Sequence, residues 1–320
     1  MESTNNNNCE NKAKKAVLLV NMGGSESESQ VKLFLQQMFL DKNILPYALP
    51  LRMFLSWQTT RKRYKKSWQC YQDMGGTDIR TSAKVYAKML KENLGSDYVT
   101  ETSFLYSNES PINQLAKLAS SGIKDITVIS LFPHPCICTH GQIREHIEAT
   151  KKMFSDVQVI FVEHIYKYQS FNDFWLENIK GYIKSESLTA PFLIFSAHSI
   201  PQTFADRGDK YKDYVVDSAT QIADSLGLEF DVGFQSRLGK AQWLSPETND
   251  LLKKYTEHKE VVIVPISFIC ENLETKFDVD TEFLPYAREE LGYENISRVK
   301  IPVGSATLLK AFIDSVKAND

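Results

Sequence analysis

The sequence predicts an α/β protein made of two similar lobes. Short β-branched runs alternate with longer amphipathic segments, which is typical of parallel sheets covered by helices. The β-branched runs fall into two sets of four. The 320 residues exceed one ordinary core and suit two domains of about 150 residues. We therefore expect two Rossmann-like lobes, each a four-stranded parallel sheet flanked by helices.

The first lobe is expected to span residues 16–167. Its strands are runs rich in valine, isoleucine and threonine, which fit a pleated sheet. Segments with apolar residues three and four apart separate these runs and predict helices. The polar, asparagine-rich residues 1–15 before the lobe predict a disordered tail. The expected strands are 16–21, 99–105, 125–131 and 157–162, with helices at 30–39 and 82–94.

The second lobe is expected to span residues 168–320 and to repeat the same alternation. Its last helix, 305–317, is expected to pack back on the first lobe. The expected strands are 191–196, 229–234, 260–267 and 298–301, with helices at 211–226 and 246–258.

The segment 45–75 interrupts the alternation of the first lobe. An apolar stretch from Leu49 to Trp57 precedes a cluster of arginines and lysines at 61–66. An apolar stretch beside a basic cluster suits a helix that lies on an anionic membrane surface. A core helix followed by a solvated helix explains the pattern equally well.

Composition narrows the classes of partner and compartment. A net charge of −3 gives no reason to expect nucleic acid. The five cysteines are odd in number and scattered, which favours a reducing compartment over a secreted disulfide framework. The N-terminus lacks the apolar region of a secretory signal, and no apolar run approaches the roughly 18 residues of a membrane span.

Four acidic residues follow the predicted strand 260–267 at steps of three, four and four. They are Glu271, Glu274, Asp278 and Glu282, and such spacing lines one helix face. Carboxylates on one face repel each other unless protons or a cation lie among them. His198 ends another predicted strand, and ligands of α/β sheets bind beyond the strand ends. We expect a site that moves protons or handles a metal ion, although acidic helix faces are most often only solvated.

A glycine-rich turn, Asn21-Met-Gly-Gly, follows the first predicted strand. Such a turn can hold phosphate on free backbone N–H groups. The sequence has no GxGxxG and no P-loop here, and several acids follow the turn. A nucleotide or sugar-phosphate enzyme is therefore disfavoured, and the glycines are expected to let the backbone approach a flat or bulky ligand.

Seven motifs together resemble the ferrochelatases, which insert ferrous iron into porphyrins. The resemblance covers about residues 16–314. Each motif alone is modest, but all seven occur in the order of the family. They are Leu18-Leu-Val-Asn-Met-Gly-Gly24, Tyr71-Gln-Asp-Met-Gly-Gly76, Ser196-Ala-His-Ser-Ile-Pro201, Arg207-Gly-Asp-Lys-Tyr211, Phe234-Gln-Ser-Arg-Leu-Gly239, Gln242-Trp-Leu-Ser-Pro-Glu-Thr248 and Val264-Pro-Ile-Ser-Phe-Ile-Cys-Glu-Asn-Leu-Glu-Thr275.

The resemblance implies roles for ten residues. His198 and Glu274 match the catalytic, metal-contacting pair that faces across the porphyrin centre. Glu271, Asp278 and Glu282 match a proton or metal path on a helix of π-type winding. The porphyrin-binding residues that it implies are Met22, Lys62, Arg63, Ser196 and Trp243, and packing beneath the site explains Trp243 equally well.

The resemblance also implies a function. The chain is expected to be a lyase that inserts Fe²⁺ into protoporphyrin IX to form protohaem, the last step of haem biosynthesis. Iron and porphyrin are then substrates, with no tightly bound cofactor, and no iron–sulfur cluster is expected because no cysteine follows Cys270. A cytoplasmic monomer or homodimer with peripheral contact to the inner membrane is expected. Coproporphyrin III, another metal or tetrapyrrole, and a non-catalytic porphyrin or haem carrier remain alternatives.

Several residues depart from the family pattern. Asn272 occupies a position where relatives commonly carry histidine, and Leu105 one where arginine is expected. The loop 132–141 contains His134 and His140. These two histidines could add metal affinity, but loop histidines are usually plain surface residues.

Overall fold

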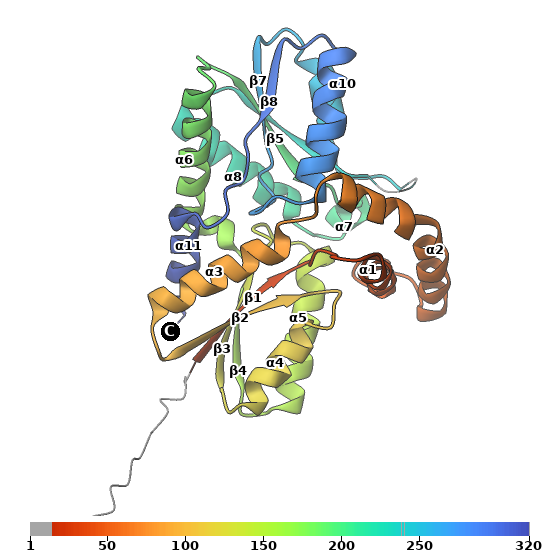
Figure 1. Cartoon of the computed structure of the whole chain (residues 1–320), viewed down its shortest axis with the longest axis vertical. Helices are drawn as coiled ribbons and strands as arrows, with labels where there is room; N and C mark the ends of the chain where they lie inside the picture. Colours follow the sequence, from red (N-terminus) through yellow and green to blue (C-terminus); the bar gives the residue numbers. More distant parts are fainter. Residues whose placement is uncertain (1–14, 238, 240, 320) are drawn as a thin grey trace, which may run out of the picture.

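The computed structural model describes residues 15–237, 239 and 241–319, so the predicted disordered tail lies outside the described residues except for Lys15. Two four-stranded sheets lie one above the other along the molecule (Figure 1). Their strand orders are β2-β1-β3-β4 and β6-β5-β7-β8, and every pairing is parallel. The predicted fold class is confirmed.

The first sheet alternates its side chains between two apolar layers. Val17 and Leu19 pack in one core cluster, whereas Leu18 and Val20 pack in another on the opposite face, as the period of two in a strand requires. The sheet comprises β1 (Lys15–Asn21), β2 (Tyr98–Phe104), β3 (Asp125–Ser130) and β4 (Gln158–Val162), with helices α3 (Ile79–Leu94), α4 (Pro111–Ser120) and α5 (Ile137–Met153).

The second sheet has the same plan and carries an unusual helix after its third strand. This helix, η2 (Glu274–Phe283), has π-type winding and continues into α10 (Leu284–Glu289). The strands are β5 (Phe192–His198), β6 (Phe230–Gln235), β7 (Glu260–Val264) and β8 (Asn295–Arg298). The other helices are α6 (Gln169–Ser185), α7 (Gln202–Asp206), α8 (Tyr211–Leu226) and α9 (Thr248–Lys254), and the short η1 (Ile165–Lys167) precedes α6.

A single apolar cluster joins the two lobes. It contains residues of both sheets and of the last helix, α11 (Ala306–Lys317), which packs against α6 and α3. The rings of Tyr86 on α3 and Phe312 on α11 meet edge to face, with centroids 5.3 Å apart. The backbone N–H of Ser305 donates to the Tyr86 hydroxyl at 3.1 Å.

Two predicted elements differ most from the structure, and the predicted strand 260–267 also ends earlier, at Val264. The last strand is Asn295–Arg298 and not 298–301, because the N–H of Ile301 donates to a Glu271 carboxylate oxygen and so leaves the strand ladder. The predicted helix 246–258 is only Thr248–Lys254. Its beginning is lost because the Pro246 carbonyl accepts the N–H of Phe234 and holds this part of the chain beside β6.

Helices α1 (Glu28–Leu40) and α2 (Leu49–Asp73) form a hairpin that stands out from the side of the molecule (Figure 1). Val31, Leu35, Phe39 and Tyr71 form the small core between the two helices. No helix in the described part of the chain is long and apolar enough to cross a membrane.

Candidate active site at the strand ends of the second sheet

His198 and Glu274 face each other beyond the carboxyl end of β5. The Nδ1 atom of His198 is 3.7 Å from the Oε1 atom of Glu274. The backbone of His198 is fully used, because its N–H donates to the Ser267 hydroxyl at 3.0 Å and its carbonyl accepts the Tyr211 hydroxyl at 2.9 Å. The imidazole is thus the only free part of this residue, and its Nδ1 is buried with no hydrogen-bond partner.

Burial shifts the pKa values of His198 and Glu274 in opposite directions, because it favours the uncharged form of each side chain. Burial lowers the pKa of His198 below 6.5, and the Asp278 carboxylate opposes this shift only in part. Burial also raises the pKa of Glu274 above 4.5. A histidine with a lowered pKa is neutral near pH 7 and can accept a proton.

Asp278 continues the acidic file along η2. Burial raises its pKa to about 6, although a hydrogen bond from the Ser236 hydroxyl opposes the rise and the Glu274 charge adds to it. Glu282 lies one step further along the helix and is exposed. Since the expected π-type winding is present, Glu274, Asp278 and Glu282 lead from the His198 side of η2 towards solvent.

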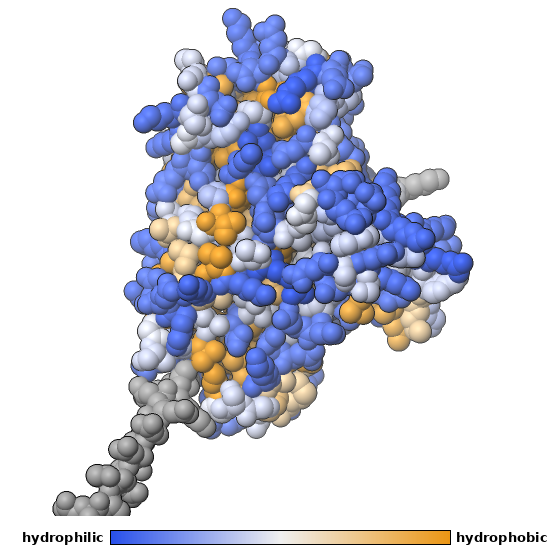
Figure 2. All heavy atoms as spheres, viewed as in Figure 1, coloured by the Kyte–Doolittle hydropathy of each residue, from blue (hydrophilic) through white to orange (hydrophobic). Residues whose placement is uncertain are grey.

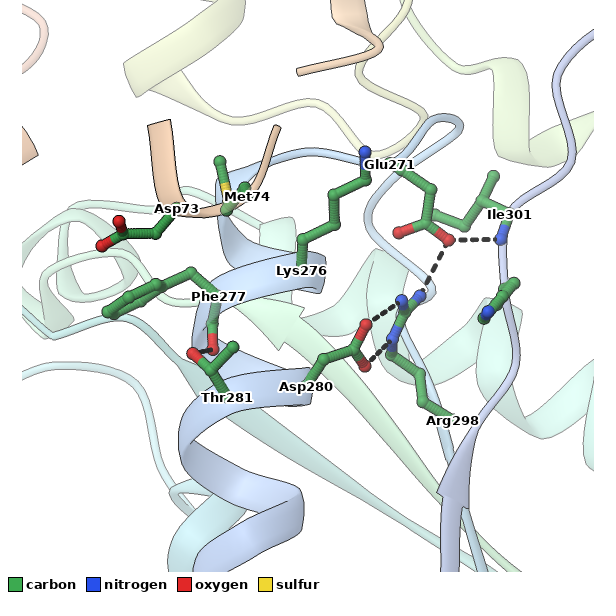
Figure 3. A pocket seen from close by; sticks show the side chains of 10 residues that line it. Asp73, Met74, Glu271, Lys276, Phe277, Asp280, Thr281, Arg298 and Ile301 are labelled. Atoms are coloured by element: carbon green, nitrogen blue, oxygen red, sulfur yellow. Dashed lines mark hydrogen bonds and ion pairs between the residues drawn. The ribbon is translucent and has the colours of Figure 1, made fainter. Parts of the chain in front are cut away.

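Glu271 does not belong to this file, so the prediction that four acids line one helix face is wrong for it. Glu271 precedes η2 and is 8% exposed. Its carboxylate accepts hydrogen bonds from the Arg298 guanidinium at 2.9 Å and the Ile301 N–H at 2.8 Å (Figure 3). It also accepts one from the Thr275 hydroxyl at 2.6 Å. These three donors occupy the carboxylate that was expected to relay protons.

Asn272 acts as a local cap. Its side-chain oxygen accepts the N–H of Thr275 at 3.0 Å, and the Thr275 hydroxyl accepts the N–H of Asn272 at 3.0 Å. This reciprocal pair starts the helical segment that contains Glu274. The amide of Asn272 therefore caps the start of the helix. A histidine in this position would also be able to bind and release a proton.

Ser196, which was predicted to bind porphyrin, is buried inside the lobe. Its exposed fraction is 0%. Its hydroxyl donates to the Gln235 side chain and lies 2.8 Å from the Thr248 hydroxyl. Gln235 in turn donates to the Glu274 carbonyl at 3.2 Å. Ser196 therefore supports the start of η2 from inside the lobe.

The strand ends of the two lobes meet near this site. The side chain of Asn21, at the end of β1, is near enough to the Cys270 thiol to oppose in part the rise of its pKa that burial causes. Met22 follows Asn21 and is half-buried against the core of the first lobe. Trp243 is half-buried and forms an isolated antiparallel β-bridge with Pro201, which follows His198 by three residues.

Tyr71 is a residue near the site that the sequence did not single out. It lies at the end of α2 and is 9% exposed. Burial raises its pKa, and the negative charge of Glu274 adds to this rise. The motif that begins at Tyr71 could have drawn attention to this residue. Nothing in that motif, however, indicated that Tyr71 lies near Glu274, two hundred residues further along the chain.

Lys62 and Arg63 are exposed on α2. Nearer the start of α2 are five apolar side chains, here called the apolar lip, that are each about half exposed. A core position for this stretch is therefore excluded. Figure 2 shows apolar side chains at the edge of the projecting hairpin of α1 and α2. The apolar lip comprises Leu49 (54%), Leu51 (46%), Met53 (56%), Phe54 (54%) and Trp57 (55%).

His134 and His140 are buried, at 2% and 0% exposure, so the expectation of surface histidines is wrong. Burial lowers the pKa of each to about 3. His134 packs among aromatic rings, including Tyr166 at 5.1 Å and Phe171 at 5.9 Å. These neighbours explain why a loop histidine is drawn into the core.

Two cavities border the site without containing His198. One, of about 450 Å³, lies on the Arg298 side of η2 (Figure 3). The other, of about 370 Å³, lies between the turn after β1 and the end of α2. A Lys276–Asp78 ion pair of 3.0 Å links η2 to the beginning of α3. No group of three or more His, Cys, Asp or Glu side chains within residues 15–237, 239 and 241–319 is placed to hold a metal ion.

Known proteins are similar to this chain over nearly its whole length. A family model described as Ferrochelatase matches residues 14–320. A protein named Ferrochelatase from Aquifex aeolicus (strain VF5) is 30% identical over 310 residues, which cover 95% of this chain and 99% of that protein. Another Ferrochelatase, from Geobacter metallireducens (strain ATCC 53774 / DSM 7210 / GS-15), is 31% identical over 292 residues, or 89% of this chain and 92% of that protein.

Solved structures share the fold at low sequence identity. The SirB protein from Bacillus subtilis with Fe3+ has a TM-score of 0.59 and 13% identity, covering 95% of this chain and 94% of that chain. The sirohydrochlorin chelatase SirB from Bacillus subtilis subspecies spizizenii, in complex with cobalt, has a TM-score of 0.58, 12% identity and the same coverage. At such identities the likeness shows the fold alone.

Proposed function

This chain belongs to the ferrochelatase family, a group of lyases that insert metal into porphyrin, and we propose that its substrates are Fe²⁺ and protoporphyrin IX. The product is then protohaem, made in the last step of haem biosynthesis. The observation that carries this proposal is the proximity of a histidine and a carboxylate, since the Nδ1 atom of His198 and the Oε1 atom of Glu274 lie 3.7 Å apart. A macrocycle does not fit between the two side chains in this arrangement, which differs from the expected placement across the porphyrin centre. Iron enters as a substrate, and the proposal includes no resident cofactor and no iron–sulfur cluster.

His198 is the proposed base. Inserting a metal into a porphyrin requires the removal of two pyrrole protons. The lowered pKa of His198 keeps its imidazole neutral near pH 7, and its Nδ1 has no competing hydrogen bond. A base in this state can accept a proton from a group brought within hydrogen-bond reach.

Glu274 and Asp278 are the proposed carriers of protons or metal between the porphyrin centre and solvent. The pKa of Asp278 is raised to about 6, so this acid can release and take up protons close to neutral pH, and burial raises the pKa of Glu274 in the same direction. Carboxylate oxygens also suit a hydrated divalent ion. Exposed Glu282 forms the outer end of this path, whereas Glu271 is removed from it by its ion pair with Arg298.

Protoporphyrin IX is favoured over coproporphyrin III for two reasons. The turn Asn21-Met-Gly-Gly is more typical of the protoporphyrin group. The exposed apolar lip suits an enzyme that exchanges an apolar substrate and product with a membrane. Met22, Lys62, Arg63 and Trp243 remain the proposed porphyrin contacts.

We propose that the protein is cytoplasmic and that its apolar lip, with the basic residues after it, contacts an anionic membrane surface. The apolar side chains are about half exposed, and Lys62 and Arg63 follow on the same helix. Replacing Met53 and Phe54 with serine should abolish sedimentation with phosphatidylglycerol vesicles. The same exchange at Met153, which is also 54% exposed but lies on α5, should not. Undiminished sedimentation of the double variant would end this part of the proposal.

The activity is tested by the anaerobic loss of porphyrin fluorescence with Fe²⁺. Protoporphyrin IX and coproporphyrin III are compared in parallel for the wild type and for His198→Ala. Turnover should vanish in His198→Ala and persist in a His258→Ala control, since His258 packs on Phe192 away from the site. Faster turnover of coproporphyrin III would correct the substrate. Tight porphyrin binding without turnover of any divalent metal would mean that the protein is a carrier.

A further inference from the structure

Arg298 carries a buried positive charge that the proposed chemistry does not use. It is the last residue of β8, an edge strand of the second sheet, and its side chain is 3% exposed. Burying a guanidinium is unfavourable unless carboxylates compensate it closely. An arginine in this place therefore needs an explanation beyond the packing of the strand.

The guanidinium joins two carboxylates that flank Glu274 in the chain. Its Nε and one terminal nitrogen donate to the two oxygens of Asp280, each at 2.7 Å. Its other terminal nitrogen donates to Glu271 at 2.9 Å (Figure 3). Glu271 comes three residues before Glu274, and Asp280 lies further along η2. Planar guanidinium groups hold such geometry better than any other cation.

The same guanidinium thereby fixes both the entry to the π-helix and its middle. Glu271 also accepts the Thr275 hydroxyl at 2.6 Å, so the contact reaches the residue next to Glu274. Helical segments of π-type winding are rare and are frequently found at functional sites. In this protein the π-helix begins at Glu274, whose carboxylate lies 3.7 Å from the Nδ1 atom of His198.

We infer that Arg298 is a positioning residue for metal insertion, which fixes Glu274 opposite His198 by holding Glu271 and Asp280. This inference rests on the proposed roles of His198 and Glu274. Arg298 itself makes no contact with either of them in the described residues. Its effect on the reaction is through the placement of Glu274, and displacements of about 1 Å in a catalytic group can cost about a hundredfold in rate.

The test compares steady-state Fe²⁺ insertion by Arg298→Lys and Arg288→Lys in the full chain. Lysine keeps the charge but cannot span two carboxylates with a planar fork. We expect kcat of R298K to fall by about ten- to a hundredfold, with KM for protoporphyrin IX changed by less than about twofold. Arg288 also donates to β8, at the Ile296 carbonyl, but touches neither Glu271 nor Asp280, so R288K should keep the wild-type kcat.

A second variant, Asp280→Asn, weakens the ion pair between Arg298 and Asp280 by changing the carboxylate, and it replaces R298K in the test if R298K does not fold. Wild-type kcat in a folded R298K or D280N, measured well below its melting temperature, would overturn the inference. A higher KM with unchanged kcat would overturn it as well, because it would place Arg298 in porphyrin binding. Glu274→Gln is measured in parallel, and full activity there would mean that the proposed role of Glu274 fails and takes this inference with it. Loss of activity in E274Q together with wild-type kcat in R298K would leave the proposed function intact and contradict only the positioning role of Arg298.

Discussion

Replacing Asp278 with asparagine should stabilise the folded protein above pH 6 while it slows metal insertion. Asparagine has nearly the same shape as aspartate and keeps an oxygen that can accept the Ser236 hydroxyl. The substitution therefore removes the negative charge with little change in packing. Activity should fall because the middle member of the proposed path no longer carries protons.

The magnitude follows from the raised pKa of Asp278. This pKa is about 6 in the folded protein against an ordinary value of 3.8. One pKa unit corresponds to about 1.36 kcal/mol, so the charged carboxylate costs about 3 kcal/mol more in the folded than in the unfolded state. Between pH 3.8 and 6 the folded state binds more protons, so wild-type stability falls as the pH rises through this window. Below it, both states are protonated and the cost disappears.

The assay is urea unfolding of metal-free protein, followed by circular dichroism at pH 4 and at pH 7.5. At pH 7.5 the free energy of unfolding of D278N should exceed that of the wild type by up to about 3 kcal/mol. At pH 4 the difference should be much smaller. Glu282→Gln is the control, because this exposed acid ends the same file and should change stability by less than about 0.5 kcal/mol at either pH. A D278N protein that is less stable than the wild type at pH 7.5, or equally stabilised at both pH values, would refute the reasoning.

Two further substitutions test predicted site residues that the structure shows to be buried, Ser196 and Glu271. Ser196→Ala removes a buried hydroxyl from Gln235 and Thr248, and it should lower the free energy of unfolding by about 1–3 kcal/mol without weakening porphyrin binding. Fluorescence titration checks the binding, and a weaker affinity would return Ser196 to the porphyrin site. Glu271→Gln should destabilise by about 2 kcal/mol in urea unfolding, because it takes a charged partner from buried Arg298. Unchanged stability would mean that Asp280 alone satisfies the arginine.

Local pattern was sufficient for most of the fold. β-branched runs and amphipathic segments located seven of the eight strands and predicted both sheets, because each of these elements buries a continuous apolar face. The strand at Asn295–Arg298 was misplaced because its apolar residues continue to Ile301. The N–H of Ile301 bonds to Glu271 instead of a neighbouring strand, and a contact thirty residues away leaves no local pattern.

The sequence by itself determined the family, the two-lobed architecture and the residues His198 and Glu274, since motifs and their order are local properties of the chain. Only the tertiary structure decided which acids remain free. Glu271 and Glu274 are three residues apart and of the same type, yet one pairs with Arg298 and the other faces His198. Ser196 and His134 were likewise assigned by burial, which depends on neighbours from other elements. The role of a polar side chain is set by whether water or a partner group surrounds it, and spacing along the chain does not contain that information.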